Sequence, residues 1–193
     1  MSEFFYKVIE TYPQDIAKIY YYLLYKLGPS YLIPDLEIPV DKLEALVQRI
    51  LGISEPVLIN YLKQTSDLGQ VCYDIKKKSE LIGIGAPARQ KKLKLYEIMN
   101  ILEEAALESE NSKQNNKINL IYSIMTRTDK DELKFLVCFL EKNLKLGISR
   151  NLIFNSLSRA ISRILVQTYE KDVYKIITKS LNQLGIKTYY LAI

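Results

Sequence analysis

The chain has 193 residues, of which 48% are hydrophobic and 25% charged, and its formal net charge at pH 7 is +5. This composition excludes wholesale disorder and is typical of one domain with one sizeable core, or of two intimately packed halves. Because histidine is absent, Ser-His and Cys-His catalytic arrangements and histidine-containing zinc sites are excluded. Two isolated cysteines, Cys72 and Cys138, occupy apolar helical positions and are expected to be reduced core residues. We therefore expect no catalytic residue, bound metal or cofactor in this chain.

Helical periodicity dominates the sequence, and no convincing strand pattern occurs, so the expected fold class is all-α. Charged residues interrupt every apolar stretch, and no membrane span is expected. Pro29, Pro34 and Pro39 predict an extended connection after the first helix, and Asp129 with Glu132 predicts a capping box. The predicted helices cover residues 13–27, 41–51, 55–64, 67–78, 93–109, 114–126, 130–145, 150–168 and 171–184.

A short pattern occurs twice in the chain. The sequence LGIS at 51–54 precedes EPVLINYL, and LGIS at 146–149 precedes RNLIFNSL. The repeat predicts a single pseudo-two-fold-symmetric multi-helix domain of about nine to twelve helices over residues 1–193. Its halves are expected at about 13–78 and 93–192, joined by a basic linker over 76–95.

The basic linker contains seven cations and one acid, a net charge of +6. One interpretation is a connection that its lysines keep solvated. The other is an electrostatic footprint for a polyanion.

Each LGIS sequence predicts a tight corner, in which the glycine ends one helix and the serine caps the next. Such a corner is either purely structural or an anion site, since the N–H groups of a helix N-terminus favour a phosphate. Lys145 and Arg150 flank the second corner, whereas the first has Arg49 nearby and Glu55 directly after its serine. Phosphate binding is therefore expected more at the second corner.

Two further segments allow both a structural and a functional interpretation. Gly69 lies at the start of a predicted helix, where it permits close packing of another helix or close approach of a phosphate. The polar segment from Glu108 to Lys117 is either a solvated loop or a contact to a nucleic-acid backbone. In the second case Ser112 would cap the next helix, and Lys113 and Lys117 would face the same side.

Together, LGISEPVLINYL, SDLGQV and the segment from Leu93 to Ile161 resemble the N-terminal DNA-binding domain of ATP-dependent DNA ligases, of the archaeal and eukaryotic replicative type. The family has elements like Asp67-Leu68-Gly69, like the loop 109–117 and like Leu144-Lys145-Leu146-Gly147. The loop here has asparagines where the family usually has glycines, and Lys145 stands where an arginine is usual. Lysine keeps the charge but loses the bidentate geometry of arginine.

The resemblance implies sequence-independent binding of double-stranded or nicked DNA in replication, repair and recombination. The partner would be the ligase catalytic portion (nucleotidyltransferase and OB-fold), in cis or in trans, which would bind ATP and magnesium. Because its lysine-x-aspartate-glycine motif is absent here, the chain is expected to be no enzyme by itself. The expected DNA-binding residues are Arg49, Gly52, Ser54, Gly69, Ser109, Ser112, Lys113, Lys117, Lys145, Gly147, Ser149 and Arg150.

The two isolated, reduced cysteines indicate an intracellular location, either the cytoplasm of a prokaryote or the nucleus of a eukaryote. The alternative function is a helical protein–protein interaction scaffold with no nucleic-acid role, in which the tyrosine-rich helix from Ile19 to Tyr25 packs on another protein. An RNA-binding module is a weaker third possibility, because the sequence has no aromatic platform.

Overall fold

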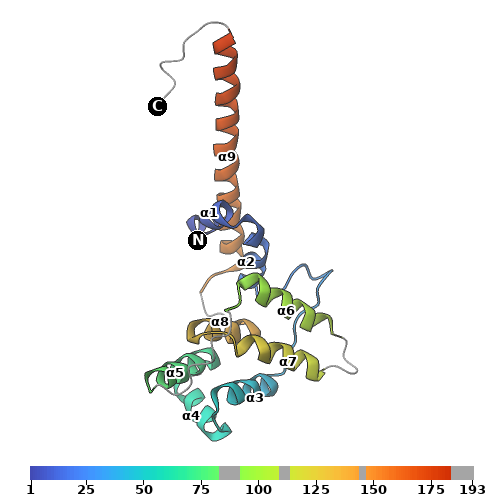
Figure 1. The fold of residues 1–193 in the computed structure, drawn as a ribbon, viewed down its shortest axis with the longest axis vertical. Helices are drawn as coiled ribbons and strands as arrows, with labels where there is room; N and C mark the ends of the chain where they lie inside the picture. Colours follow the sequence, from blue (N-terminus) through green and yellow to red (C-terminus); the bar gives the residue numbers. More distant parts are fainter. Residues whose placement is uncertain (83–91, 109–113, 144–146, 184–193) are drawn as a thin grey trace. The chain divides into compact units, whose positions relative to one another are not determined.

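The computed structural model describes residues 1–82, 92–108, 114–143 and 147–183 (Figure 1). Within these residues it contains nine α-helices and no strand, which confirms the all-α class. None of the described helices combines the length and apolarity that crossing a bilayer requires. The chain packs as two compact units, one formed by Ala17–Gly147 and the other by Met1–Ile16 together with Ile148–Ile193. The pseudo-two-fold symmetry and the halves suggested by the repeat remain predictions.

The helices between the extended connection and the second LGIS sequence lie close to their predicted positions. The segment between the second and third helices has no helix or strand, as its prolines predicted. The elements are α1 (Ser2–Thr11), a 3-10 turn (Pro13–Asp15), α2 (Ile16–Leu23), α3 (Val40–Leu51), α4 (Glu55–Thr65), α5 (Leu68–Leu81), α6 (Leu95–Leu107), α7 (Gln114–Met125), α8 (Lys130–Leu140) and α9 (Arg150–Gln183).

The helices differ from the prediction at both ends of the chain and at the end of α8. Helix α1 was not predicted, and the predicted helix over 13–27 is a 3-10 turn followed by the short α2. The two helices predicted over 150–184 are one helix, α9, because no glycine or proline separates them. Helix α8 ends at Leu140 rather than at 145, because Lys142 adopts a left-handed conformation with φ of 55°. The Asn143 N–H then donates to the Cys138 carbonyl at 2.8 Å, which closes the helix.

The core of the larger unit, Ala17–Gly147, is centred on α5 and α8, its most extensively packed helices. Helix α6 packs on α7, and α3 contacts both α5 and α7. Apolar residues at helical spacing supply the core because they place one face of each helix inward. They include Leu43, Leu46 and Val47 of α3, Val71 and Cys72 of α5, and Leu133, Leu136 and Val137 of α8.

The glycine in the first turn of α5 is explained by this packing. Gly69 is buried, and a Cβ atom there would lie 2.5 Å from Cys138 Sγ and 2.8 Å from the Lys134 carbonyl oxygen. The packing interpretation of Gly69 is therefore confirmed. Cys72 and Cys138 are buried, reduced thiols, as predicted, and burial raises the pKa of the Cys72 thiol to about 12.

The smaller unit is held together by α1 and α9. Phe5 of α1 is fully buried, and Ile153, Ser156 and Ala160 form the buried face at the beginning of α9. The Tyr6 hydroxyl donates to Gln167 Oε1 at 3.0 Å. The Arg163 guanidinium lies 4.0 Å from the centre of the Tyr6 ring and 2.9 Å from the Glu3 carboxylate. These contacts join the first and last described helices of the chain.

Candidate nucleic-acid interface

The first LGIS sequence forms the helix corner that was predicted. Gly52 ends α3 in the left-handed conformation with φ of 65°, and the Ile53 N–H donates to the Gln48 carbonyl at 3.1 Å. Ser54 takes the N-cap position of α4, although its side chain makes no capping hydrogen bond. Nothing lies within 4 Å of the position where a Gly52 Cβ would be. The corner is consequently exposed and open.

The N-terminus of α4 after this corner is poorly equipped to bind an anion. An α-helix leaves the N–H groups of its first turn without acceptors in the helix, and these groups attract negative charge. In α4, Pro56 removes one of those donors, and the negative charge of the Glu55 carboxylate repels a phosphate. The corner therefore needs a neighbouring side chain to attract a phosphate.

Arg49 in the last turn of α3 is such a side chain. It is exposed, and its guanidinium carbon lies 4.1 Å from the centre of the Tyr122 ring of α7. In the part of the chain that the structure describes, no carboxylate lies within ion-pair distance of Arg49. Sequence reasoning missed Tyr122, because no local pattern links a tyrosine of α7 to an arginine of α3.

The second LGIS sequence differs from the first. Gly147 is left-handed, with φ of 62°, but it does not end α8, contrary to the prediction, because Lys142 and Asn143 have already closed that helix. Ser149 does cap α9, as predicted, since its Oγ accepts the Leu152 N–H at 3.2 Å. Arg150 is exposed in the first turn of α9.

Two further predicted residues, Lys117 and Gly69, lie within the part of the chain that the structure describes. Lys117 of α7 is half-buried and lines a cavity of about 780 Å³ in the larger unit, together with Leu36, Pro39, Ile118 and Leu140. Gly69 is buried against α8 and leaves little surface for a phosphate to approach. The other predicted residues lie outside the described residues: Ser109, Ser112, Lys113 and Lys145.

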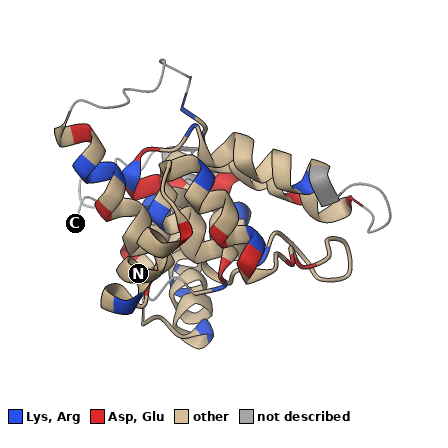
Figure 2. Cartoon of the chain, turned by 90° about the horizontal axis from the view of Figure 1, so that it is seen from below, with Lys and Arg blue, Asp and Glu red and all other residues tan. Residues whose placement is uncertain are grey.

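Several lysines of the basic linker are engaged in the fold. Lys76 donates to the Thr128 carbonyl at 2.5 Å, and burial lowers the pKa of its amine. Lys78 donates to the Tyr61 hydroxyl at 2.8 Å, and Lys92 donates to Asp129 at 2.7 Å. Figure 2 shows cationic and acidic positions interspersed on the described ribbons. Of these three lysines only Lys92 is paired with carboxylates, because the partners of Lys76 and Lys78 are uncharged.

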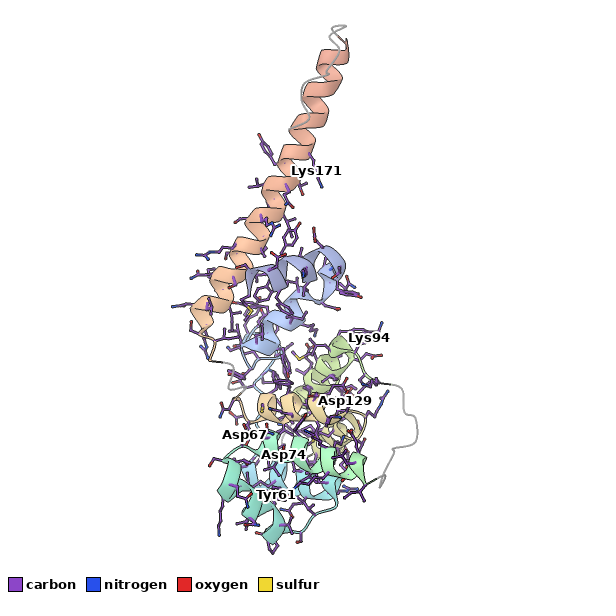
Figure 3. The ribbon with its side chains drawn as sticks, turned by 90° about the vertical axis from the view of Figure 1, so that its left-hand side faces the viewer. Tyr61, Asp67, Asp74, Lys94, Asp129 and Lys171 are labelled. Atoms are coloured by element: carbon purple, nitrogen blue, oxygen red, sulfur yellow. The ribbon has the colours of Figure 1, made fainter. Side chains whose placement is uncertain are left out.

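One group among the described residues has the atoms to hold a cation. Asp67, Cys138 and Glu141 each bring one ligand atom within 4.8 Å of the others. Asp67 lies at the start of α5 (Figure 3), and its carboxylate accepts the Gln70 N–H at 3.0 Å. Asp67 is thus the N-cap of α5, and helix capping accounts for its position.

The fold and its exposed corners fit an all-helical domain of the class that the sequence resemblance implied. Residues 1–158 match the family described as the DNA ligase N terminus, and the chain belongs to that family. The match covers α1 to α8 and ends within α9.

Individual relatives agree with this assignment. The chain is 26% identical over 148 residues to a DNA ligase of Pyrobaculum calidifontis, covering 77% of this chain and 25% of the relative. It is 28% identical over 149 residues to a DNA ligase of Saccharolobus islandicus, covering 75% of this chain and 25% of the relative. The chain therefore spans about a quarter of the length of these curated relatives.

Proposed function

We propose that this chain binds double-stranded and nicked DNA without sequence preference, as the DNA-binding part of an ATP-dependent DNA ligase. The observation that carries the proposal is the family match over residues 1–158. The exposed Arg49 beside the Gly52 corner and the exposed Arg150 at the N-terminus of α9 support it. Guanidinium groups and first-turn N–H groups bind phosphate oxygens at positions that do not depend on the bases.

The partner of the chain in this proposal is a ligase catalytic portion with nucleotidyltransferase and OB-fold parts, in cis or in trans. That portion would bind ATP and magnesium and seal the nick, whereas this chain would hold the duplex. The process would be DNA replication, repair or recombination inside the cell. The relatives support such a division of labour, because each is a DNA ligase about four times as long as the matched region.

The alternative, a protein-interaction scaffold, relied on the tyrosines between Ile19 and Tyr25. Of its four tyrosines, Tyr21, Tyr22 and Tyr25 pack on the core of the larger unit instead. The Tyr22 ring stacks on Phe139 with 4.9 Å between ring centres, and its hydroxyl donates to the Phe135 carbonyl at 3.0 Å. The main feature in favour of the scaffold is thus used within the chain.

Titration of a labelled nicked duplex at several salt concentrations tests the proposal. If the chain makes about five phosphate contacts, the slope of log K against log salt should be about −4 to −5. Duplexes of different sequence should bind equally. Salt-independent binding, or none at low salt, would contradict DNA binding.

The same titration compares the two corners. We expect Lys145→Glu and Arg150→Glu each to weaken binding by about 1–2 kcal/mol, because each loses a phosphate contact and introduces a repulsion. Arg49→Glu should cost less, since Glu55 and Pro56 already weaken the first corner. Circular dichroism melts control for folding. Equal losses at both corners would mean that the duplex uses them evenly, and no loss for Lys145→Glu and Arg150→Glu would remove the second corner from the interface.

A further inference from the structure

Two arginines among the described residues stack on tyrosines, and their environments differ in charge. Arg163 lies 4.0 Å from the Tyr6 ring centre and also forms an ion pair with Glu3. Arg49 lies 4.1 Å from the Tyr122 ring centre, with no carboxylate within ion-pair distance among the described residues. The charge of Arg163 is thus partly neutralised within the fold, whereas the stack at Arg49 fixes the side chain and leaves its charge available.

Tyr122 is well placed to fix that side chain. It belongs to α7, whose neighbouring residues Ile121, Ile124 and Met125 are fully buried. The half-buried Tyr122 ring packs against the same core, so the ring itself has little freedom to move. Helices α3 and α7 are in direct contact, which sets the distance between the arginine and the ring.

We infer that Tyr122 is a positioning residue for DNA binding: its ring holds the Arg49 guanidinium beside the Gly52 corner, ready to contact a backbone phosphate. The inference rests on the proposed function and adds a residue that does not itself touch DNA. A free arginine loses rotamer entropy when it binds, and an arginine held on a ring has lost part of it already. The planar guanidinium stacks on one face and still presents its N–H groups at its edge.

The test measures binding of a nicked duplex by variants of the full 193-residue chain. Tyr122→Leu should weaken binding about two- to fivefold, the range of an exposed cation–π contact. If Arg49 no longer reaches its phosphate, the salt slope should also become shallower by about 0.9. Tyr122→Phe keeps the ring and should bind like the wild type. Tyr96→Leu, a partly exposed tyrosine of α6, is the matched control and should also bind like the wild type.

A double-mutant cycle separates positioning from a general effect on the fold. In an Arg49→Ala background, Tyr122→Leu should cause no additional loss. Arg49→Lys, which keeps the charge but cannot stack as a plane, should bind about two- to fivefold more weakly. In NMR spectra of the free chain, the Arg49 δ protons should be shifted upfield by the ring current, and the shift should vanish in Tyr122→Leu and remain in Tyr122→Phe.

Four results would overturn the positioning role of Tyr122. Wild-type affinity and salt slope in a folded Tyr122→Leu variant would overturn the positioning role while DNA binding stands. A loss that persists in the Arg49→Ala background would overturn it as well. If Tyr122→Leu fails to fold, wild-type binding by Arg49→Lys together with unshifted Arg49 δ protons would overturn it. Failure of the wild-type chain to bind DNA would overturn both this role and the proposed function.

Discussion

Gly69 sets how closely α5 and α8 approach each other. A Cβ at this position would lie 2.5 Å from Cys138 Sγ and 2.8 Å from a backbone oxygen, and neither distance is compatible with normal packing. The sulfur belongs to a short buried side chain and the oxygen to a helix backbone. The oxygen cannot move without displacing α8, so the glycine is required by the fold.

We predict that Gly69→Ala destabilises the chain by about 1–3 kcal/mol, the range for overpacking a core. The higher helix propensity of alanine, about 1 kcal/mol, offsets part of a larger steric cost. Chemical denaturation followed by circular dichroism measures the change. Gly52→Asn is the control, because that position is open and asparagine tolerates the left-handed conformation. A Gly69→Ala variant as stable as the wild type would refute the steric explanation.

The role of a single residue of the site could be predicted from sequence only where that role depends on the residue's neighbours in the chain. Ser149 was predicted as a cap and Gly52 as a helix end, since each depends on its immediate neighbours. The stack of Arg49 on Tyr122 could not be predicted, because it depends on how α3 packs against α7. For the same reason, the sequence alone could not decide whether Gly69 serves close helix packing or a phosphate contact.

Among the elements, α8 has the most complete start signal. Asp129 accepts the Glu132 N–H at 2.9 Å, and the Glu132 carboxylate accepts the Asp129 N–H at 2.9 Å. This is the capping box that the sequence predicted. Burial acts to raise the pKa of Asp129, but hydrogen bonds from the Glu132 N–H and from Lys92 outweigh it, so the pKa lies below its ordinary value.

We predict that Asp129→Ala lowers the free energy of unfolding by about 1 kcal/mol at pH 7. Because the folded pKa is lowered, the ionised side chain stabilises the fold above the ordinary carboxyl pKa. That contribution is lost as the pH falls through the folded pKa. The difference between variant and wild type should therefore shrink in acid.

Urea denaturation at pH 7 and in acid measures this effect. Asp131→Ala is the matched control, because Asp131 is an exposed acid in the same helical turn and is not the cap. It should cost only a few tenths of a kcal/mol through the helix dipole. An equal loss for both variants would show that charge near the helix end matters and the cap does not.

The end of α3 was predicted correctly, whereas the end of α8 was not. Helix α3 ends at Gly52, as expected, because glycine takes the left-handed conformation without strain. Lys142 takes the same conformation at the end of α8, and nothing in its local sequence indicates that. Helix α1 has no side-chain cap, and its contacts with a distant helix give it a buried face.

For the whole molecule, we predict that the chain neither reacts with ATP nor seals a nick. Its sequence contains no lysine-x-aspartate-glycine tetrapeptide, and it covers only a quarter of the length of its ligase relatives. Incubation with radiolabelled ATP followed by denaturing electrophoresis should give no labelled band at the mass of the chain. A full-length relative in the same assay is the positive control. A stable lysine–AMP adduct on this chain would disprove the prediction.

The pairing of α1 with α9 has a consequence for how the chain is made. The larger unit is one continuous stretch, so it can close as soon as it has left the ribosome. Helix α1 emerges first, yet the helix that covers Phe5 begins only at Arg150. At translation rates of about 5–20 residues per second, roughly 7–30 s pass between the synthesis of α1 and the synthesis of the start of α9. A ten-residue helix is only marginally stable alone, so Phe4 and Phe5 are accessible to chaperones throughout that time.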